Sequence, residues 1–183
     1  MFKSWSGTRK KLEQELICDK LKGRVKYFIT RYNNAHDESA RFAILIDNKE
    51  VIKGNEFLYY QKYSYIENKL KSDNGIPMRK WNGKYIENEE INKIFEKRIE
   101  KLMEYNGEIS EWQFHNAIEE YLNQPIEKSI NSDNPFIRMF AILDRRVGKR
   151  TLNKLKVNID KEPKWLQQFY LLRLETIDKQ IKI

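Results

Sequence analysis

The fold is decided by one stretch, Phe136-Ile-Arg-Met-Phe-Ala-Ile-Leu-Asp-Arg-Arg-Val-Gly-Lys-Arg-Thr-Leu152. Apolar residues recur there every three or four positions, the spacing that places side chains on one face of an α-helix. This face consists of Phe136, Met139, Phe140, Leu143 and Val147, while Arg138, Ile142, Arg145 and Lys149 fall on the other side. Asn134 and Pro135 favour a helix start, because Asn accepts from free first-turn amides and Pro has no amide. The pattern predicts a helix with one buried face, around which the rest of the chain packs.

Gly148 predicts the end of this helix, because glycine tolerates the left-handed geometry that is common at helix C-termini. Beyond it, residues 149–156 predict a second short helix with Leu152 and Leu155 facing inward.

Helices are expected throughout the C-terminal half. Asn88 and Asn106-Gly107 bound one helix, whose predicted buried face is Ile91, Ile94, Phe95, Ile99, Leu102 and Met103. Ser110 and Gln113 predict a capping box for the next helix. Glu162 and Pro163 start the last one, which has a wide apolar face. We expect a bundle or stack of short antiparallel helices, like a helical-repeat protein, although no fixed period occurs.

The N-terminal half predicts a small antiparallel sheet. Residues 24–32 alternate apolar and polar side chains, as strands do, and residues 41–46 and 49–52 predict two more strands. Asp47-Asn48 predicts a two-residue turn, because both residue types tolerate positive φ. An amphipathic helix expected over residues 8–21 is the nearest cover for the sheet. Residues 56–71 predict a further helix with an aromatic surface.

These patterns together predict an α+β protein, with an N-terminal helix and small sheet followed by a group of short helices. We expect an α+β lobe of residues 1–87 and a helical lobe of residues 88–183. The two should form one compact unit, because 183 residues supply one full hydrophobic core rather than two.

The composition bounds the class of protein. Hydrophobic residues make up 40% of the chain and aromatic residues 13%, as in globular proteins. No apolar run approaches the roughly 20 residues of a membrane-spanning helix, and the N-terminus lacks the apolar core of a secretory signal. The single cysteine, Cys18, excludes an internal disulfide and a multi-cysteine zinc site. We therefore expect a cytoplasmic protein that does not bind membranes.

The segment Asp144-Arg-Arg-Val-Gly-Lys-Arg150 has two interpretations. In the first, its cations complement the negative end of a helix dipole, and Asp144 pairs with a neighbouring arginine. In the second, Arg145, Arg146, Lys149 and Arg150 bind an anion or a partner, because guanidinium groups bind carboxylates and phosphates bidentately. Six cations and no acid lie between Arg145 and Lys156. The sequence therefore favours a non-catalytic protein-interaction or adaptor module, with a protein partner or self-association.

Nucleic-acid binding is the alternative function. The net charge of +8 is compatible with it. The predicted contacts are the cations Arg24, Lys26 and Arg31 and the stacking residues Tyr59, Tyr60 and Tyr63. However, the cations are spread along the chain rather than clustered. The chain is also rich in Lys, Asn and Ile together, which is typical of AT-rich coding sequence, so the lysine count partly reflects genome composition. Tyrosines also suit the edge of a core, with each hydroxyl reaching water.

We expect no enzyme activity, no cofactor and no metal. Only two histidines occur, so a metal centre would need carboxylates for most of its ligands. One nuclease-like arrangement is open, in which Asp37 and Asp47 hold Mg²⁺ while Lys49 polarises a phosphate. The same residues suit a plain hairpin, in which Asp47 accepts from the amides of its own turn and Lys49 extends into solvent. Separately, His36-Asp37 resembles the paired ligands of metal-dependent phosphohydrolases, although those sites need further His and Asp residues.

Four short motifs carry a resemblance to a known family. They are Leu21-Lys-Gly-Arg-Val-Lys-Tyr27, Thr30-Arg-Tyr32, His36-Asp37 and Leu143-Asp-Arg-Arg-Val-Gly-Lys-Arg150. As a set, they resemble the signatures of a family of uncharacterised bacterial proteins of about this length. The resemblance implies a bacterial, cytoplasmic protein and assigns no activity, cofactor or catalytic residue. Residues 57–87 match none of these signatures.

Overall fold

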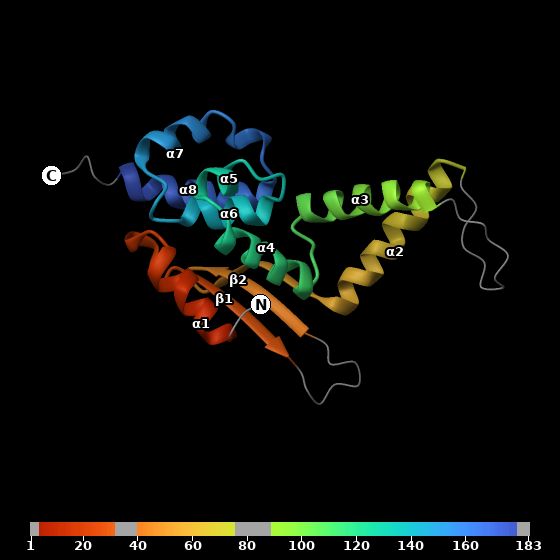
Figure 1. Ribbon diagram of the computed structural model, residues 1–183, viewed down its shortest axis with the longest axis horizontal. Coiled ribbons are helices and arrows are strands. Elements are labelled where there is room, and N and C mark those ends of the chain that lie inside the picture. Colours follow the sequence, from red (N-terminus) through yellow and green to blue (C-terminus); the bar gives the residue numbers. More distant parts are fainter. Residues whose placement is uncertain (1–3, 32–39, 76–88, 179–183) are drawn as a thin grey trace.

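The computed structural model describes residues 4–31, 40–75 and 89–178. It consists of a body, in which helices pack on a small sheet, and an arm made of two long helices (Figure 1). The arm helices are α2 (Glu56–Asp73) and α3 (Glu89–Tyr105). The predicted α+β class is confirmed.

The sheet has the three predicted strands in the order β1-β2-β3, all antiparallel. They are β1 (Val25–Arg31), β2 (Ala40–Ile46) and β3 (Lys49–Asn55). Asp47 and Asn48 join the last two strands with φ values of 49° and 66°. The two-residue turn predicted from their tolerance of positive φ is therefore confirmed.

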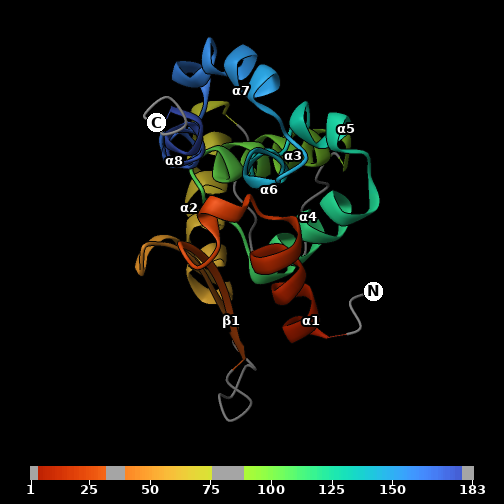
Figure 2. The same cartoon turned by 90° about the vertical axis from the view of Figure 1, so that its left-hand side faces the viewer.

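One face of the sheet packs mainly on α4 (Glu111–Asn123). The rings of Phe42 and Phe114 stack with their centroids 4.6 Å apart. The ring centroids of Tyr27 and Phe140 lie 5.6 Å apart in the same core. The edge-on view in Figure 2 shows α1 (Trp5–Lys10) and α4 on the same side of the sheet. The N-terminal helix, expected as the cover, contributes less to this face than α4 does.

The helix predicted to be central is α6 (Pro135–Leu143), and eight of its nine residues are buried. It contacts α4, α5 (Ile126–Ile130) and α8 (Lys164–Asp178) at once. The expectation of a single buried face is therefore wrong, since Ile142 on the opposite side is fully buried as well. The predicted start is confirmed, because the Asn134 side chain accepts from the Phe136 amide at 2.8 Å.

The N-terminal segment differs most from its prediction. The helix begins at Trp5 rather than residue 8, continues from α1 into a wider π-helical turn, η1 (Lys11–Leu16), and stops there. Ile17 is extended and forms an antiparallel bridge with Asp144. A short 3₁₀ turn, η2 (Asp19–Leu21), follows. The helix predicted to reach residue 21 is cut short because the backbone here bonds to the distant loop after α6.

The arm has a small core of its own, separate from that of the body. Tyr59 of α2 packs against Ile99 and Met103 of α3. The buried face predicted for α3 is correct at Ile99 and Met103 but wrong at Ile94 and Leu102, which are 66% and 43% exposed. The predicted cap Asn88 lies outside the described residues. The helix ends as expected at Gly107, whose φ is 77°.

The arm joins the body at the C-terminal end of α3. Glu104 Oε1 accepts from the Asn134 side chain at 2.9 Å, and the Trp165 indole donates to the Tyr105 carbonyl at 3.1 Å. Burial, reinforced by the charge of Glu100, raises the pKa of Glu104 to about 7. The main core of the body combines residues of both predicted lobes, from Leu12 to Ile52 and from Ile109 to Ile177.

Candidate partner-binding site

The segment Asp144–Gly148 links α6 to α7 (Lys149–Lys156). The short helix predicted over residues 149–156 is confirmed, with Leu152 buried and Leu155 partly buried. The first helix, however, ends at Leu143, five residues before the predicted break. Gly148 is extended, with φ −81° and ψ 169°, and serves as the N-cap of α7 rather than as the left-handed end of α6.

The carboxylate of Asp144 organises this loop from inside the body. Asp144 is 1% exposed and accepts from the Arg146 backbone amide at 2.7 Å, the Arg146 guanidinium at 2.6 Å and the Tyr121 hydroxyl. The hydrogen bonds to Asp144 raise the pKa of Arg146 above its usual range. Burial raises the pKa of Tyr121 as well, and the charge of Asp144 adds to the effect. The predicted pairing of Asp144 with a neighbouring arginine is confirmed.

Arg173 of α8 holds the loop from a second side. Its side chain is 6% exposed, donates to the Val147 carbonyl at 2.9 Å and to the Ile142 carbonyl at 3.2 Å, and also reaches Thr176. A buried guanidinium is stabilised only when such acceptors are fixed around it. The backbone of the loop is therefore fixed relative to α8.

The N-terminal segment holds the loop from a third side. The Cys18 amide donates to the Leu143 carbonyl, and the Arg145 amide donates to the Leu16 carbonyl, both at 2.8 Å. These two bonds flank the Ile17–Asp144 bridge. The loop is thus bound by α4, α8 and the N-terminal segment together.

The remaining cations of this segment point outward, and we call Arg145, Lys149 and Arg150 the basic platform. All three are exposed, and none forms a hydrogen bond or ion pair through its side chain with a residue that the structure describes. Arg146 lies beside them, engaged with Asp144 but 45% exposed. The four cations predicted as one set therefore divide into one structural arginine and three exposed cations, of which Arg145 lies near enough to Asp19 for its charge to help lower the pKa of that carboxyl.

The platform lies at the end of a helix where cations are not favoured. Lys149 and Arg150 occupy the first turn of α7, which contains no acid. The free amides of a helix N-terminus carry a partial positive charge, so these cations add to it rather than complement it. The first interpretation, in which all the cations stabilise a helix C-terminus, is therefore wrong for Lys149 and Arg150.

The residues proposed for nucleic-acid contact lie on different parts of the molecule. Arg24 forms an ion pair with Asp47, and Lys26 donates to Asn48, at the turn end of the sheet. Arg31 lies at the other end of the sheet, where it is paired with Ala40 of β2. The two ends are about 20 Å apart for strands of this length.

The three tyrosines of that set lie in α2 and differ in exposure. Tyr59 is 8% exposed, and its hydroxyl accepts from Gln113. Tyr63 packs against the arm core, and only Tyr60, at 62%, is open to solvent. The three rings therefore do not line one stacking surface.

The plain-hairpin alternative to the nuclease-like arrangement is correct at Lys49 but wrong at Asp47. Asp47 does not accept from its own turn, as the hairpin hypothesis predicted, but forms a bidentate pair with Arg24 at 2.9 and 2.7 Å. This pair lowers the pKa of Asp47. Lys49 is exposed, as expected, while His36 and Asp37 lie outside the described residues. Within the described ranges, no cluster of three His, Cys, Asp or Glu residues is placed to hold a metal ion.

Two parts of the site were missed from the sequence. Neither Tyr121 nor Arg173 was identified as a site residue from the sequence. Arg173 could have been noticed because it stands between Leu172 and Leu174 in the last helix, where a cation on an apolar face indicates buried acceptors.

The fold and the site together define a small α+β protein with a rigid loop that displays cations. A family model described as the SF0329 protein family matches residues 4–174. The chain belongs to this family. Comparison with curated proteins found no match, and comparison with solved structures found none either. Among the described helices, none is both long enough and apolar enough to cross a membrane.

Proposed function

We propose that this protein is a non-catalytic interaction module whose basic platform binds an acidic segment of a partner protein. The observation that carries the proposal is the contrast within one loop. Asp144, Arg146 and Val147 are bonded or buried, whereas Arg145, Lys149 and Arg150 are exposed and unpaired among the described residues.

The rigid loop favours binding for a thermodynamic reason. Ordering a flexible loop at an interface costs free energy, and a loop already held by the protein avoids that cost. Bonds to α4, α8 and the N-terminal segment hold this one. Two arginines and a lysine so placed suit carboxylates, because each guanidinium binds a carboxylate with two parallel hydrogen bonds.

The composition around the platform favours an acidic protein over single-stranded nucleic acid. No aromatic residue occurs between Arg145 and Lys164. Binding of single strands without sequence preference relies on bases stacking against aromatic side chains. Duplex binding through phosphates alone remains an outcome that the experiment below distinguishes.

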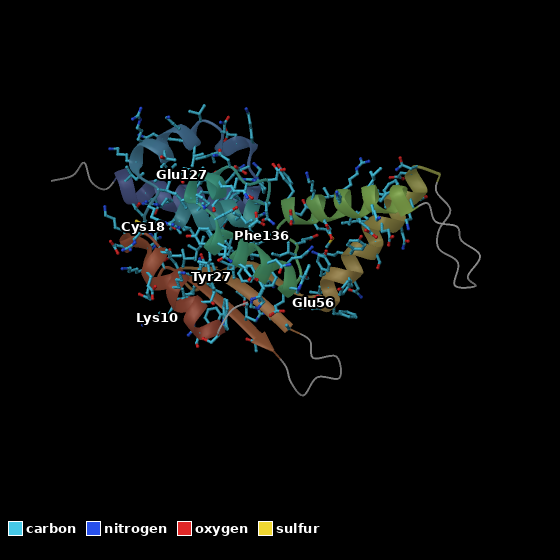
Figure 3. All side chains as sticks on the ribbon, in the orientation of Figure 1. Lys10, Cys18, Tyr27, Glu56, Glu127 and Phe136 are labelled. Carbon is cyan, nitrogen blue, oxygen red and sulfur yellow. The ribbon has the colours of Figure 1, made fainter. Side chains whose placement is uncertain are left out.

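The test compares the wild type with the triple variant Arg145→Ala/Lys149→Ala/Arg150→Ala. Arg146 stays in place, because its loss would leave Asp144 buried without its cation. The matched control is Arg9→Ala/Lys10→Ala/Lys11→Ala, which removes the same charge from the first helix, where Lys10 is labelled in Figure 3. Fluorescence anisotropy measures the affinity for a labelled ten-residue glutamate peptide and for a labelled DNA duplex at several salt concentrations.

We expect the triple variant to bind the peptide about tenfold more weakly, since three exposed ion pairs contribute roughly 0.2–1 kcal/mol each. The control should bind like the wild type. An equal loss of peptide affinity in both variants would mean that binding depends on net charge and not on the basic platform. A preference for the DNA duplex, with a steep salt dependence, would indicate that the basic platform binds nucleic acid rather than an acidic protein.

A further inference from the structure

The arm meets the body at the C-terminal end of α3, close to α6 (Figure 1). Among the described residues, two side chains of the body donate hydrogen bonds to this end of α3. Asn134 donates to Glu104 Oε1 at 2.9 Å, and the Trp165 indole donates to the Tyr105 carbonyl at 3.1 Å. We call these two contacts the joint. Any movement of the end of α3 away from the body must break them.

Asn134 connects the joint to the most buried helix of the body. Its Oδ1 atom accepts from the Phe136 amide at 2.8 Å and from the Ile137 amide at 3.4 Å, at the start of α6. Its Nδ2 atom donates to Glu104. One amide side chain therefore caps α6 and binds the arm at the same time. The carboxyl group of Glu104 is thus one hydrogen bond away from the cap of α6.

Two further carboxylates act on Glu104. Glu100 lies one turn earlier on α3, and Glu120 belongs to α4 of the body. Burial and the charges of these two residues raise the pKa of Glu104 to about 7. None of the three forms an ion pair with another described residue. From the second arm helix, Glu104 is faced by Tyr59, which stays neutral because burial raises its pKa to about 12.

The cations near Glu104 are engaged with other acids. Arg138 of α6 forms a bidentate pair with Glu162, at 3.1 and 2.6 Å. Lys101 is exposed, and its Nζ atom lies 4.0 Å from Asp133. Both cations lower the pKa of Glu104, but less than burial and the neighbouring acids raise it. The joint therefore contains a half-buried carboxyl group that no cation fully neutralises.

We propose that the joint is a pH-sensitive contact, which is closed while the Glu104 carboxyl is protonated and loosens when this group ionises. The neutral carboxyl still accepts from Asn134 through its carbonyl oxygen, and it does not repel Glu120 across the joint. The ionised carboxyl is repelled by Glu100 and Glu120, and water solvates it better when the end of α3 moves away. The basic platform takes no part in this contact, so the inference goes beyond the proposed function.

The direction of the effect follows from the linkage between proton binding and opening. In the closed joint the pKa of Glu104 is about 7, whereas its ordinary value is 4.5. Opening therefore releases a proton between these two pH values, and the open population rises by up to about tenfold per pH unit from pH 4.5 to 7. Above pH 7 the carboxyl is ionised in both states, and the open population levels off.

The Trp165 indole reports on the joint directly, since its hydrogen bond to the Tyr105 carbonyl breaks on opening. Two-dimensional ¹⁵N NMR between pH 4.5 and 8.5 measures the chemical shift of this indole N–H. Hydrogen exchange, compared between proteins at the same pH, measures how often the joint opens. The comparison at equal pH removes the pH dependence of the exchange chemistry itself.

The variants separate Glu104 from other titrating groups. Glu104→Gln keeps an acceptor for Asn134 but cannot ionise, and Glu120→Gln removes the like charge on the body. The matched control is Glu96→Gln, which removes the same charge from α3 about 12 Å away along the helix. His115→Gln controls for histidine, which also titrates near neutral pH. Circular dichroism checks that each variant is folded.

In the wild type, the Trp165 signal should titrate with a midpoint near pH 7. At pH 8 its indole hydrogen should exchange about tenfold faster, or more, than in Glu104→Gln, and the two rates should converge towards pH 4.5. Glu120→Gln should lower the midpoint by about 0.5 pH units. Glu96→Gln and His115→Gln should titrate like the wild type.

Three results would overturn the proposal. The first is a wild-type midpoint below about pH 5.5, where an ordinary glutamate titrates. The second is a Trp165 titration that persists unchanged in Glu104→Gln. The third is equal exchange in the wild type and Glu104→Gln at pH 8, since ionisation would then leave the joint closed. If Glu104→Gln does not fold, an unchanged midpoint in Glu120→Gln overturns the proposal instead.

Discussion

At the scale of single residues, Asp144 links the candidate site to the core. Asp144 is 1% exposed, and its carboxylate accepts hydrogen bonds from the Arg146 amide, the Arg146 guanidinium and the Tyr121 hydroxyl. Leaving a buried hydrogen-bond donor without its acceptor is costly, because the donor cannot regain a bond to water. The loop that carries the basic platform therefore depends on a residue that a binding partner would not touch.

Replacing Asp144 with Ala should lower the free energy of unfolding by about 3 kcal/mol, because the buried Tyr121 hydroxyl and the Arg146 backbone amide both lose their acceptor. Urea denaturation followed by circular dichroism measures this change. Asp19→Ala is the control, since Asp19 is exposed, and both its ion pair with Lys22 and its weaker interaction with Arg145 lie on the surface. That variant should change stability by less than about 0.5 kcal/mol. Similar losses in both variants would contradict the assigned role of Asp144.

At the scale of elements, the approach of β3 to the start of α4 depends on one glycine. A Cβ atom on Gly54 would lie 2.4 Å from Phe42 Cε1 and 2.8 Å from the Ile109 carbonyl oxygen. The ring of Phe42 is itself stacked on Phe114, so it has little room to move. A glycine here lets the strand, the ring and the backbone before α4 pack in contact.

Gly54→Ala should therefore lower the free energy of unfolding by about 3 kcal/mol, as overpacking against fixed atoms does. Gly148→Ala is the matched control, because no atom lies within 4 Å of its added Cβ and its φ of −81° suits any residue. The control should lie within about 0.5 kcal/mol of the wild type in the same urea titration. If the two variants were equally stable, β3 would have to be further from α4 than described.

Elements that depend on local chemistry were predictable from the sequence. The Asp47-Asn48 turn and the capping box of Ser110 and Gln113 were both confirmed, because neighbouring residues determine them. The end of the N-terminal helix at Leu16 was not predictable, since the residues that interrupt it lie near position 144. The burial of Ile142 was missed for a similar reason, because periodicity reveals one packed face but not several.

In the candidate site, too, features set by neighbouring residues were predictable and features set by distant contacts were not. The four cations of the segment were found from composition alone, and so was the pairing of Asp144 with an arginine. Which arginine pairs depends on the direction of each side chain after the helix end, and that end was placed too late in the sequence. The roles of Tyr121 and Arg173 depend on contacts between α4, α8 and the loop, which no sequence pattern encodes.

At the scale of the whole molecule, stability is expected to be uneven. Eight of nine residues of α6 are buried, whereas in α2 only Tyr59 and Lys71 are. Amide hydrogens in a well-packed helix exchange through global unfolding, while those in sparsely packed helices exchange through local opening.

Hydrogen exchange measured by mass spectrometry at 2 μM should therefore show the slowest exchange in α6 and much faster exchange in residues 64–73 of α2. Helices α4 and α8 serve as internal references, since both contribute buried residues to the main core. An α2 as protected as α6 would contradict this distribution of stability.

The bridge between Ile17 and Asp144 also bears on when the protein can fold during its synthesis. The ribosome makes the chain from the N-terminus, so the first helix emerges long before the loop that pairs with its end. Contacts between residues this far apart in sequence form late and slow the folding of a domain. Until residues 143–145 have been translated, the backbone of residues 16–18 lacks the partners that it has in the folded protein. The body of this protein therefore closes only after the segment around Asp144 has been made.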